Sequence, residues 1–265
     1  MKKMSKETRY KNLVAKAMAS YPVYDRNQEL QPSKLYWCKE CEEINLWTYW
    51  QGRNHLDADI LLVGQDWGNP WADDMGSFMK KLPNVQEGPM ADYMDGNKSI
   101  TDDHLSKLFQ EINPKLNISK PCENVFFTNF VLGYRTGKIS GDFKNQWAKS
   151  DAKFFEELVD IIEPKVVLCL GISVFDAVIR VYYPKGSPAN GGYNSFIESE
   201  RNPIVVEYAS EKRMAVFALA HCGAIGTMNR NRGYQYNDKL DLQRQDWRKV
   251  AEYIKNCEDL SYLCR

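Results

Sequence analysis

The sequence lacks any run of about 18 uncharged apolar residues, which is the length that a membrane-spanning helix requires. Its first residues, 1–9, are polar and lack the apolar stretch of a secretory signal peptide. An excess of charge is also missing, because 35 basic residues balance 35 acidic ones. Strongly basic chains bind nucleic acid through their overall charge, so any such contact here would depend on a local basic patch. We therefore expect a cytoplasmic protein that makes no contact with a membrane.

A disulfide framework is not expected either. The seven cysteines are an odd number and are scattered along a chain without a secretory signal, which predicts reduced thiols. Only Cys38 and Cys41 form a motif, and they are either ordinary thiols or half of a zinc site completed by His55 or Cys122. No Gly-x-Gly-x-x-Gly and no P-loop follows a predicted strand, which argues against a doubly wound nucleotide-binding enzyme.

Short apolar runs alternate with helical patterns along the chain. Two of these runs, 59–64 and 166–171, end in glycine and suit buried parallel strands. Ser173 is predicted to cap the helix that follows the second run and extends to Val181. Further strands are predicted at 123–130, 203–208 and 214–220, and helices at 7–21, 102–112, 154–162 and 240–255.

Strands that alternate with helices indicate a mostly parallel sheet covered on both faces. We therefore expect an α/β protein, a three-layer α/β/α sandwich with a central sheet of about four strands. It should form one compact unit, with an N-terminal helical extension over 1–57 and an α/β domain over 58–265. The stretch 67–97 is rich in Gly, Pro, Asp and Asn and predicts a long surface loop, a feature that is uncommon unless it serves function.

Three polar residues stand at the ends of apolar runs that are predicted as strands: Asp66, Asn129 and His221. In an open parallel sheet, ligands bind outside the carboxyl ends of the strands. Parallel strands would therefore bring a carboxylate, an amide and an imidazole to one edge of the sheet. The competing interpretations are that Asp66 caps the next turn and that the Asn129 amide is satisfied by backbone groups.

Four segments resemble the uracil-DNA glycosylase superfamily. The segment 60–66, Ile-Leu-Leu-Val-Gly-Gln-Asp, is similar to the family's first motif, and 125–132, Val-Phe-Phe-Thr-Asn-Phe-Val-Leu, to its second strand. The segment 164–171 begins Pro-Lys-Val-Val and ends Leu-Gly, as in the family, and 216–221 is similar to the strand that ends in the motif histidine. The likeness covers roughly residues 35–232, and the order of its elements is more specific than any single motif.

The resemblance implies a role for each residue at the strand ends. Asp66 would position or deprotonate the attacking water, Asn129 would bind the pyrimidine edge, and a neutral His221 would donate to a carbonyl oxygen of the base. Gln65 and Trp67 would contribute to base binding, with the base extruded from its stack. Hydrolysis of an N-glycosidic bond builds positive charge on the sugar and negative charge on the base, so an anion and hydrogen-bond donors stabilise that charge.

The last motif departs from the family pattern. Where the family has His-Pro-Ser, this chain has His221 followed by Cys and Gly, and the Pro-Tyr that follows the aspartate in the main class is Trp67-Gly here. The base that is recognised is therefore not carried over. The candidates for DNA binding are Ile225 or Met228 as an apolar wedge, and Arg230 and Arg232 as phosphate contacts.

The pair Cys38 and Cys41 resembles the start of the iron-sulfur class of this family. That class supplies two more cysteines after the asparagine strand, whereas the segment 129–165 contains none. A thiolate cluster needs four ligands, so no iron-sulfur cluster is expected, and zinc at Cys38 and Cys41 is the alternative to free thiols.

The resemblance implies a DNA glycosylase of the base-excision-repair type, which hydrolyses the N-glycosidic bond of uracil or another deaminated or damaged base without a cofactor. Its partner would be single- or double-stranded DNA that contains a modified base. The alternative is a superfamily member that binds a nucleobase, nucleotide or nucleic acid without excising a base. The balanced charge and the altered last motif favour that alternative.

Overall fold

In the computed structural model of this protein, a mostly parallel sheet forms the centre of the fold. The structure describes residues 4–23, 34–37, 44, 55–66, 100–113, 124–135, 143–184, 189, 191–209, 211–257 and 260. Four neighbouring strands run parallel and a fifth pairs antiparallel at one edge, in the spatial order β3 (Val125–Asn129), β2 (Ile60–Gly64), β5 (Val166–Leu170), β7 (Lys212–Leu219) and β6 (Ile204–Tyr208).

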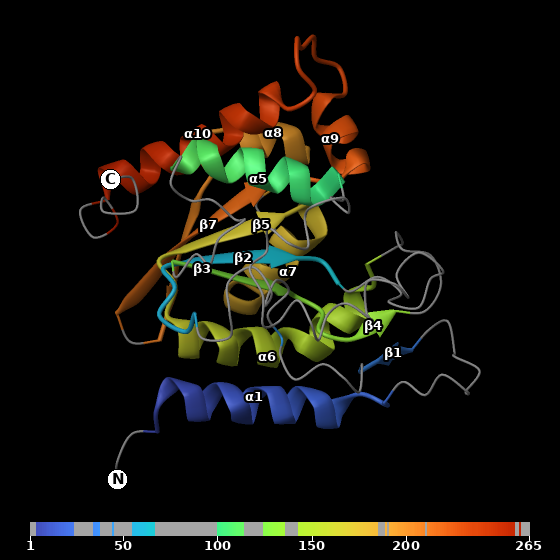
Figure 1. Ribbon diagram of the computed structural model, residues 1–265, viewed down its shortest axis with the longest axis vertical. Coiled ribbons are helices and arrows are strands. Elements are labelled where there is room, and N and C mark those ends of the chain that lie inside the picture. The colour runs from blue at the N-terminus through green and yellow to red at the C-terminus, as the bar shows by residue number, and fades with distance from the viewer. Residues whose placement is uncertain are drawn as a thin grey trace.

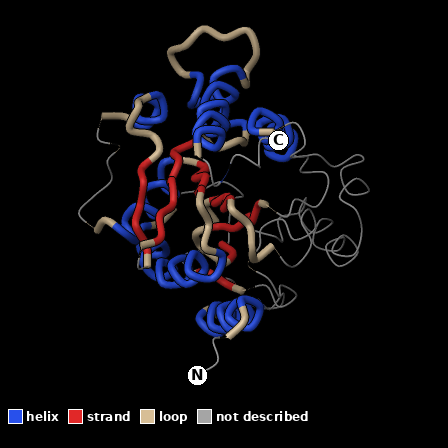
Figure 2. The backbone as a smooth tube through the Cα atoms, turned by 90° about the vertical axis from the view of Figure 1, so that its left-hand side faces the viewer, coloured by secondary structure: helices blue, strands red, loops and turns tan. Residues whose placement is uncertain are grey.

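Helices cover both faces of this sheet, as Figures 1 and 2 show. One face is covered by α5 (Ile100–Ile112) and α10 (Asp241–Asn256), and the other by α6 (Asn145–Ile162) and α7 (Ile172–Tyr182). The predicted three-layer α/β/α sandwich is therefore confirmed. The sheet has five strands where about four were expected, because β6 extends it as a hairpin partner of β7.

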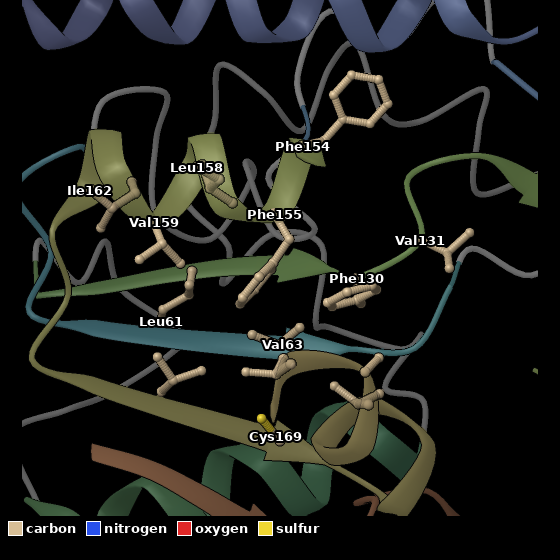
Figure 3. Close-up of a cluster of buried hydrophobic side chains, with 14 of the residues drawn as sticks. Leu61, Val63, Phe130, Val131, Phe154, Phe155, Leu158, Val159, Ile162 and Cys169 are labelled. Atoms are coloured by element: carbon tan, nitrogen blue, oxygen red, sulfur yellow. The ribbon is translucent and has the colours of Figure 1, made fainter. Parts of the chain in front are cut away.

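The central strands are apolar throughout because both of their faces are buried. Alternate residues of β2 point to opposite sides: Leu61 and Val63 lie in the core beneath α6, whereas Ile60 and Leu62 pack against α5 and α10. Figure 3 shows the α6 side, where the rings of Phe130 and Phe155 lie 5.0 Å apart between helix and sheet.

The N-terminal extension packs onto the sandwich at two places. Helix α1 (Lys6–Ser20) is capped by the Ser5 hydroxyl, which accepts a hydrogen bond from the Thr8 amide, and its apolar stripe lies against α6 (Figure 1). Strand β1 (Leu35–Tyr36) pairs antiparallel with β4 (Tyr134–Arg135) in a separate two-stranded sheet. Helix α1 and the α/β elements therefore share one hydrophobic core.

Three local predictions were wrong. Ser173 is not the cap of α7, because the N-cap is Gly171, which makes no side-chain bond. Helix α6 begins at Asn145, earlier than expected, and two short helices were missed, α8 (Tyr193–Glu198) and α9 (Ala224–Asn231). The predicted surface loop 67–97 lies outside the described residues. None of the helices in the described part of the chain has the length and apolar character needed to cross a bilayer.

Candidate active site at the carboxyl edge of the sheet

The strand register brings the three predicted residues to one edge of the sheet. Asn129 pairs with Gly64, and both Asp66 and His221 lie two residues beyond the last residue of their strands. Strands β2 and β7 flank β5, so two inter-strand spacings separate their backbones by about 10 Å. Asp66 and His221 therefore start on either side of the end of β5, and Asn129 starts on the other side of β2, at the same edge of the sheet.

Gly171 directly follows the middle strand, β5, and places no side chain at the end of that strand. Its φ of 104° favours glycine, and its amide donates to the Leu219 carbonyl over 2.7 Å. A Cβ added at Gly171 would lie 4.0 Å from the Cβ of His221. The turn from β5 into α7 therefore passes beside His221 without filling the edge.

Asn129 presents a buried hydrogen-bond donor. Its residue is only 3% exposed, and among the described residues its Nδ2 atom has no hydrogen-bond partner. Strand alternation places it on the same face as Phe127, toward α5 and α10. Leaving a buried donor unpaired costs about 1–3 kcal/mol, so this amide is suited to meet an acceptor on a bound molecule.

Asp66 is held by two donors. Its side chain is 3% exposed; Oδ1 accepts from Arg135 Nε at 3.0 Å, and Oδ2 accepts from Gln65 Nε2 at 3.3 Å. Burial raises the pKa of the Asp66 carboxyl above its ordinary value, and the charge of Arg135 with the two hydrogen bonds opposes that rise. Gln65, predicted to bind the base, thus contacts the carboxylate of Asp66 in this structure.

Arg135 is the residue at this edge that sequence reasoning missed. It belongs to β4, which lies beyond the arrowheads of β2 and β3 in Figure 1, and its side chain is only 8% exposed. In the sequence it is one arginine among 35 basic residues, and no motif marks it. Only the fold of the segment that follows β3 brings it to Asp66.

The segment that carries Arg135 is fixed by buried contacts. Asp151 on α6 accepts hydrogen bonds from the Leu132 amide at 2.8 Å and from the Tyr21 hydroxyl. Gly133 allows Tyr21 to approach, because a Cβ there would lie 2.6 Å from the Tyr21 ring and 2.7 Å from Leu35. Residues of the N-terminal extension therefore help to position the arginine.

His221 is held as a neutral donor. The Gly223 amide donates to its Nδ1 over 2.9 Å, so the proton of the neutral ring resides on Nε2. Burial lowers the pKa of the His221 imidazole below its ordinary value of 6.5. The ring is therefore expected to be uncharged at neutral pH and to offer an Nε2–H donor.

A buried network anchors the backbone of His221. Gln243 on α10 donates from Nε2 to the carbonyl oxygens of Ala220 and His221, each at 3.3 Å, and accepts from Thr227 at 2.8 Å. His104 on α5 hydrogen-bonds the Cys222 carbonyl through Nδ1 at 2.7 Å. Helices α5, α9 and α10 therefore fix the turn that presents the imidazole.

Two glycines are required by the close packing of this turn. A Cβ added at Gly226 would lie 2.2 Å from the His221 carbonyl oxygen, a distance that backbone atoms cannot accept. A Cβ at Gly223 would lie 3.0 Å from the His221 ring and 3.1 Å from Thr101. The glycine that follows His221 and Cys222 thus suits a tight turn against α5 and α9.

The predicted DNA-binding residues fall into two groups. Ile225 and Met228 are each 60% exposed and lie three residues apart on one side of α9, a helix that was not predicted. Arg232 is exposed just after α9. These three residues are accessible to a partner.

Arg230 requires a correction, because it is not a surface residue. It is 2% exposed, and its guanidinium binds Asp246 through Nε at 2.7 Å and Nη2 at 2.9 Å, and Glu198 through Nη1 at 2.9 Å. The buried Asp246 and the exposed Glu198 already accept from Nε and both Nη atoms, so Arg230 stabilises the packing of α8, α9 and α10 instead of contacting phosphate.

The remaining predictions concern residues that the structure leaves undescribed. Trp67, Cys38, Cys41 and Cys122 lie outside the described residues. His55, the other proposed zinc ligand, is buried, and its Nδ1 lies 3.3 Å from the Val125 carbonyl oxygen. Within the described ranges, no group of three or more His, Cys, Asp or Glu side chains is arranged to hold a metal ion.

Comparison of the sequence with protein-family models and with curated proteins finds no match. Because a fold of this kind supports many chemistries, the function has to be inferred from the groups at the carboxyl edge.

Proposed function

We propose that this protein is a DNA glycosylase that hydrolyses the N-glycosidic bond of uracil or another deaminated or damaged base. The observation that supports it most is the combination at one edge of the sheet: the Asp66 carboxylate, the Asn129 Nδ2 donor, which has no partner among the described residues, and the neutral His221 imidazole. The resemblance of the four sequence segments to the uracil-DNA glycosylase superfamily supports the same reaction.

Each of these three side chains would stabilise one part of the reaction. As the bond to the sugar breaks, Asp66 stabilises the positive charge on the sugar and orients the water that attacks it. The Nε2–H of His221 donates to the base oxygen on which negative charge develops, and the Asn129 Nδ2 donates to an acceptor on the base edge. Loss of one such donor typically costs about 3 kcal/mol of barrier lowering.

Access to the base requires that it leave the DNA stack. The exposed apolar pair Ile225 and Met228 on α9 begins three residues after Cys222, close in sequence to the His221 turn. In this proposal the pair fills the gap that the extruded base leaves, and the exposed Arg232 binds a neighbouring phosphate.

Release of free base tests the proposal. Single- and double-stranded oligonucleotides that carry uracil, hypoxanthine or xanthine are incubated with the wild type, Asp66→Asn and Asp57→Asn, the last being the same substitution at a side chain that is 92% exposed. We expect release by the wild type and Asp57→Asn and none by Asp66→Asn. Full activity of Asp66→Asn would remove Asp66 from the mechanism.

A second candidate function is binding of a nucleobase or nucleotide without cleavage. It is favoured by the contacts of Asp66, whose carboxylate is buried and already accepts from Arg135 and Gln65. Calorimetric titration with free uracil, together with folded protein that is silent on every modified oligonucleotide, would support this function. DNA binding that weakens steeply with added salt would instead favour the glycosylase.

A further inference from the structure

A buried carboxylate beside a buried guanidinium is the least expected feature of the candidate site. The side chains of Asp66 and Arg135 are 3% and 8% exposed, and Arg135 Nε lies 3.0 Å from Asp66 Oδ1. A carboxylate removed from water takes up a proton unless a positive charge or hydrogen bonds favour the anion. Water activation by Asp66, however, needs the anion.

We propose that Arg135 is a positioning residue that keeps Asp66 ionised and oriented for the proposed hydrolysis. This inference rests on the proposed function. Arg135 donates to Oδ1 and Gln65 to Oδ2, so both oxygens are fixed from known directions. Each carboxylate oxygen can accept about two hydrogen bonds, so an acceptor position remains for a water molecule.

The surroundings of the pair support a role for charge as well as for geometry. Of the described residues, Arg135 on β4 is the charged group that acts on Asp66, and Gln65 is the polar one. Burial raises the pKa of Asp66 even with the arginine in place, and without the arginine the pKa would rise further toward the protonated acid. A protonated Asp66 would neither stabilise a positive sugar nor accept a proton from water.

The position of Arg135 is set from outside the main sheet. Its backbone pairs with Leu35 of β1, and the preceding residues are fixed by Asp151 and Tyr21. A purely structural ion pair between β4 and β2 is the competing explanation. That explanation predicts a loss of stability with the same relative loss of activity at every pH.

Two readouts separate these explanations. The first is the NMR titration of the Asp66 carboxyl carbon in protein labelled at aspartate, assigned by comparison with Asp66→Asn. The second is the single-turnover rate of base release as a function of pH. The variants are Arg135→Gln, which removes the charge, and Arg135→Lys, which retains it without the planar guanidinium. Arg213→Gln is the matched control, because Arg213 pairs with Glu207 in an exposed ion pair.

In Arg135→Gln we expect the titration midpoint of Asp66 to rise by about one pH unit or more. The relative rate loss should be about tenfold greater at low pH than at high pH, because less of the variant carries an ionised Asp66. In Arg135→Lys the titration midpoint of Asp66 should rise less, and in Arg213→Gln it should not rise.

An unchanged midpoint in folded Arg135→Gln would overturn the proposal, as would a midpoint in Arg135→Lys that rises as far as in Arg135→Gln, or an equal relative rate loss of Arg135→Gln at every pH. The titration does not depend on catalysis. If the wild type releases no base, the proposed function fails and the role of Arg135 in hydrolysis falls with it, whereas the titration still shows whether the arginine keeps Asp66 ionised.

Discussion

Replacing Arg230 by methionine should destabilise the protein strongly, because it leaves a buried charge without its partner. Arg230 is 2% exposed and the Asp246 side chain 3% exposed, and two nitrogen-oxygen contacts of 2.7 Å and 2.9 Å join them. Methionine has a similar length but no charge. Removing one partner of such a pair typically costs about 3–5 kcal/mol of the free energy of unfolding.

The loss of unfolding free energy in Arg230→Met should depend on pH, and the pKa of Asp246 sets the direction. Burial raises the pKa of Asp246 above its ordinary value, and Arg230 opposes that rise, so the pKa of Asp246 rises further in Arg230→Met. An acid with a raised folded-state pKa adds stability below its unfolded pKa and loses that stability as pH rises through the folded one. The variant should therefore be closer to the wild type at about pH 5 than at about pH 8.

Urea unfolding followed by circular dichroism at both pH values measures the difference. A thermal scan should show a loss in Tm on the order of 10 °C for a chain of this size. In the double variant Arg230→Met with Asp246→Leu, most of the stability should return because no unpaired buried charge remains, and the Glu198 side chain is 38% exposed. Arg232→Met, the exposed neighbour, serves as the control.

The result that would refute this reasoning is an Arg230→Met variant that loses less than about 1 kcal/mol at about pH 8 and binds DNA as weakly as Arg232→Met does. That outcome would mean that the guanidinium is free for phosphate and that the buried ion pairs are not formed in solution.

Three further predictions concern the groups around the site. Gly226→Ala should cost about 1–3 kcal/mol in urea unfolding because its Cβ meets the His221 backbone, whereas Met228→Ala on the exposed side of α9 should cost less than about 0.5 kcal/mol. The ¹⁵N shifts of His221 should report the Nε2-protonated neutral ring and a pKa below 6.5; an Nδ1-protonated ring would contradict the bond from Gly223. Tyr21→Phe should cost about 1–3 kcal/mol because buried Asp151 loses a donor, and an unchanged urea midpoint would rule that bond out.

The parallel sheet was predictable because its signal is local. A strand that is buried on both faces reads as a short apolar run, and Ile60–Gly64 and Val166–Leu170 show this pattern with little interruption. The residues that follow such strands are brought to one edge by the parallel register, so the placement of Asn129 and His221 follows from the same pattern.

The beginning of α9 could not be read from the sequence because its usual markers are missing. The N-cap is Gly223, which has no side chain to accept a hydrogen bond, and the first turn contains no acidic residue. The helix is held instead by tertiary contacts, among them the bond from Thr227 to Gln243. For α7 the sequence pattern predicted the wrong cap, because Ser173, a favourable capping residue, lies inside the helix and not before it.

The partners of the buried arginines Arg135 and Arg230 could not be predicted from the sequence either. Arg135 meets Asp66 across 69 residues, and Arg230 meets Asp246 across 16 and Glu198 across 32. No periodicity connects such positions, and an arginine is most often exposed, so the sequence favoured a surface role for Arg230. Only the packing of separate elements decides which arginine is buried against a carboxylate.

The chemistry of the site therefore depends on more than the motif at the strand ends. The register of β2, β3 and β7 supplies the positions of Asp66, Asn129 and His221, but other elements set their protonation. Gly223 fixes the His221 tautomer through its amide, and Arg135 opposes protonation of Asp66. Since Arg135 is held by β1 and by contacts of Tyr21, the N-terminal extension takes part in setting the charge of the site. In a chain with the same strand-end residues but without that support, the pKa of Asp66 would be raised further, so less of the carboxyl would carry the charge that the proposed hydrolysis needs.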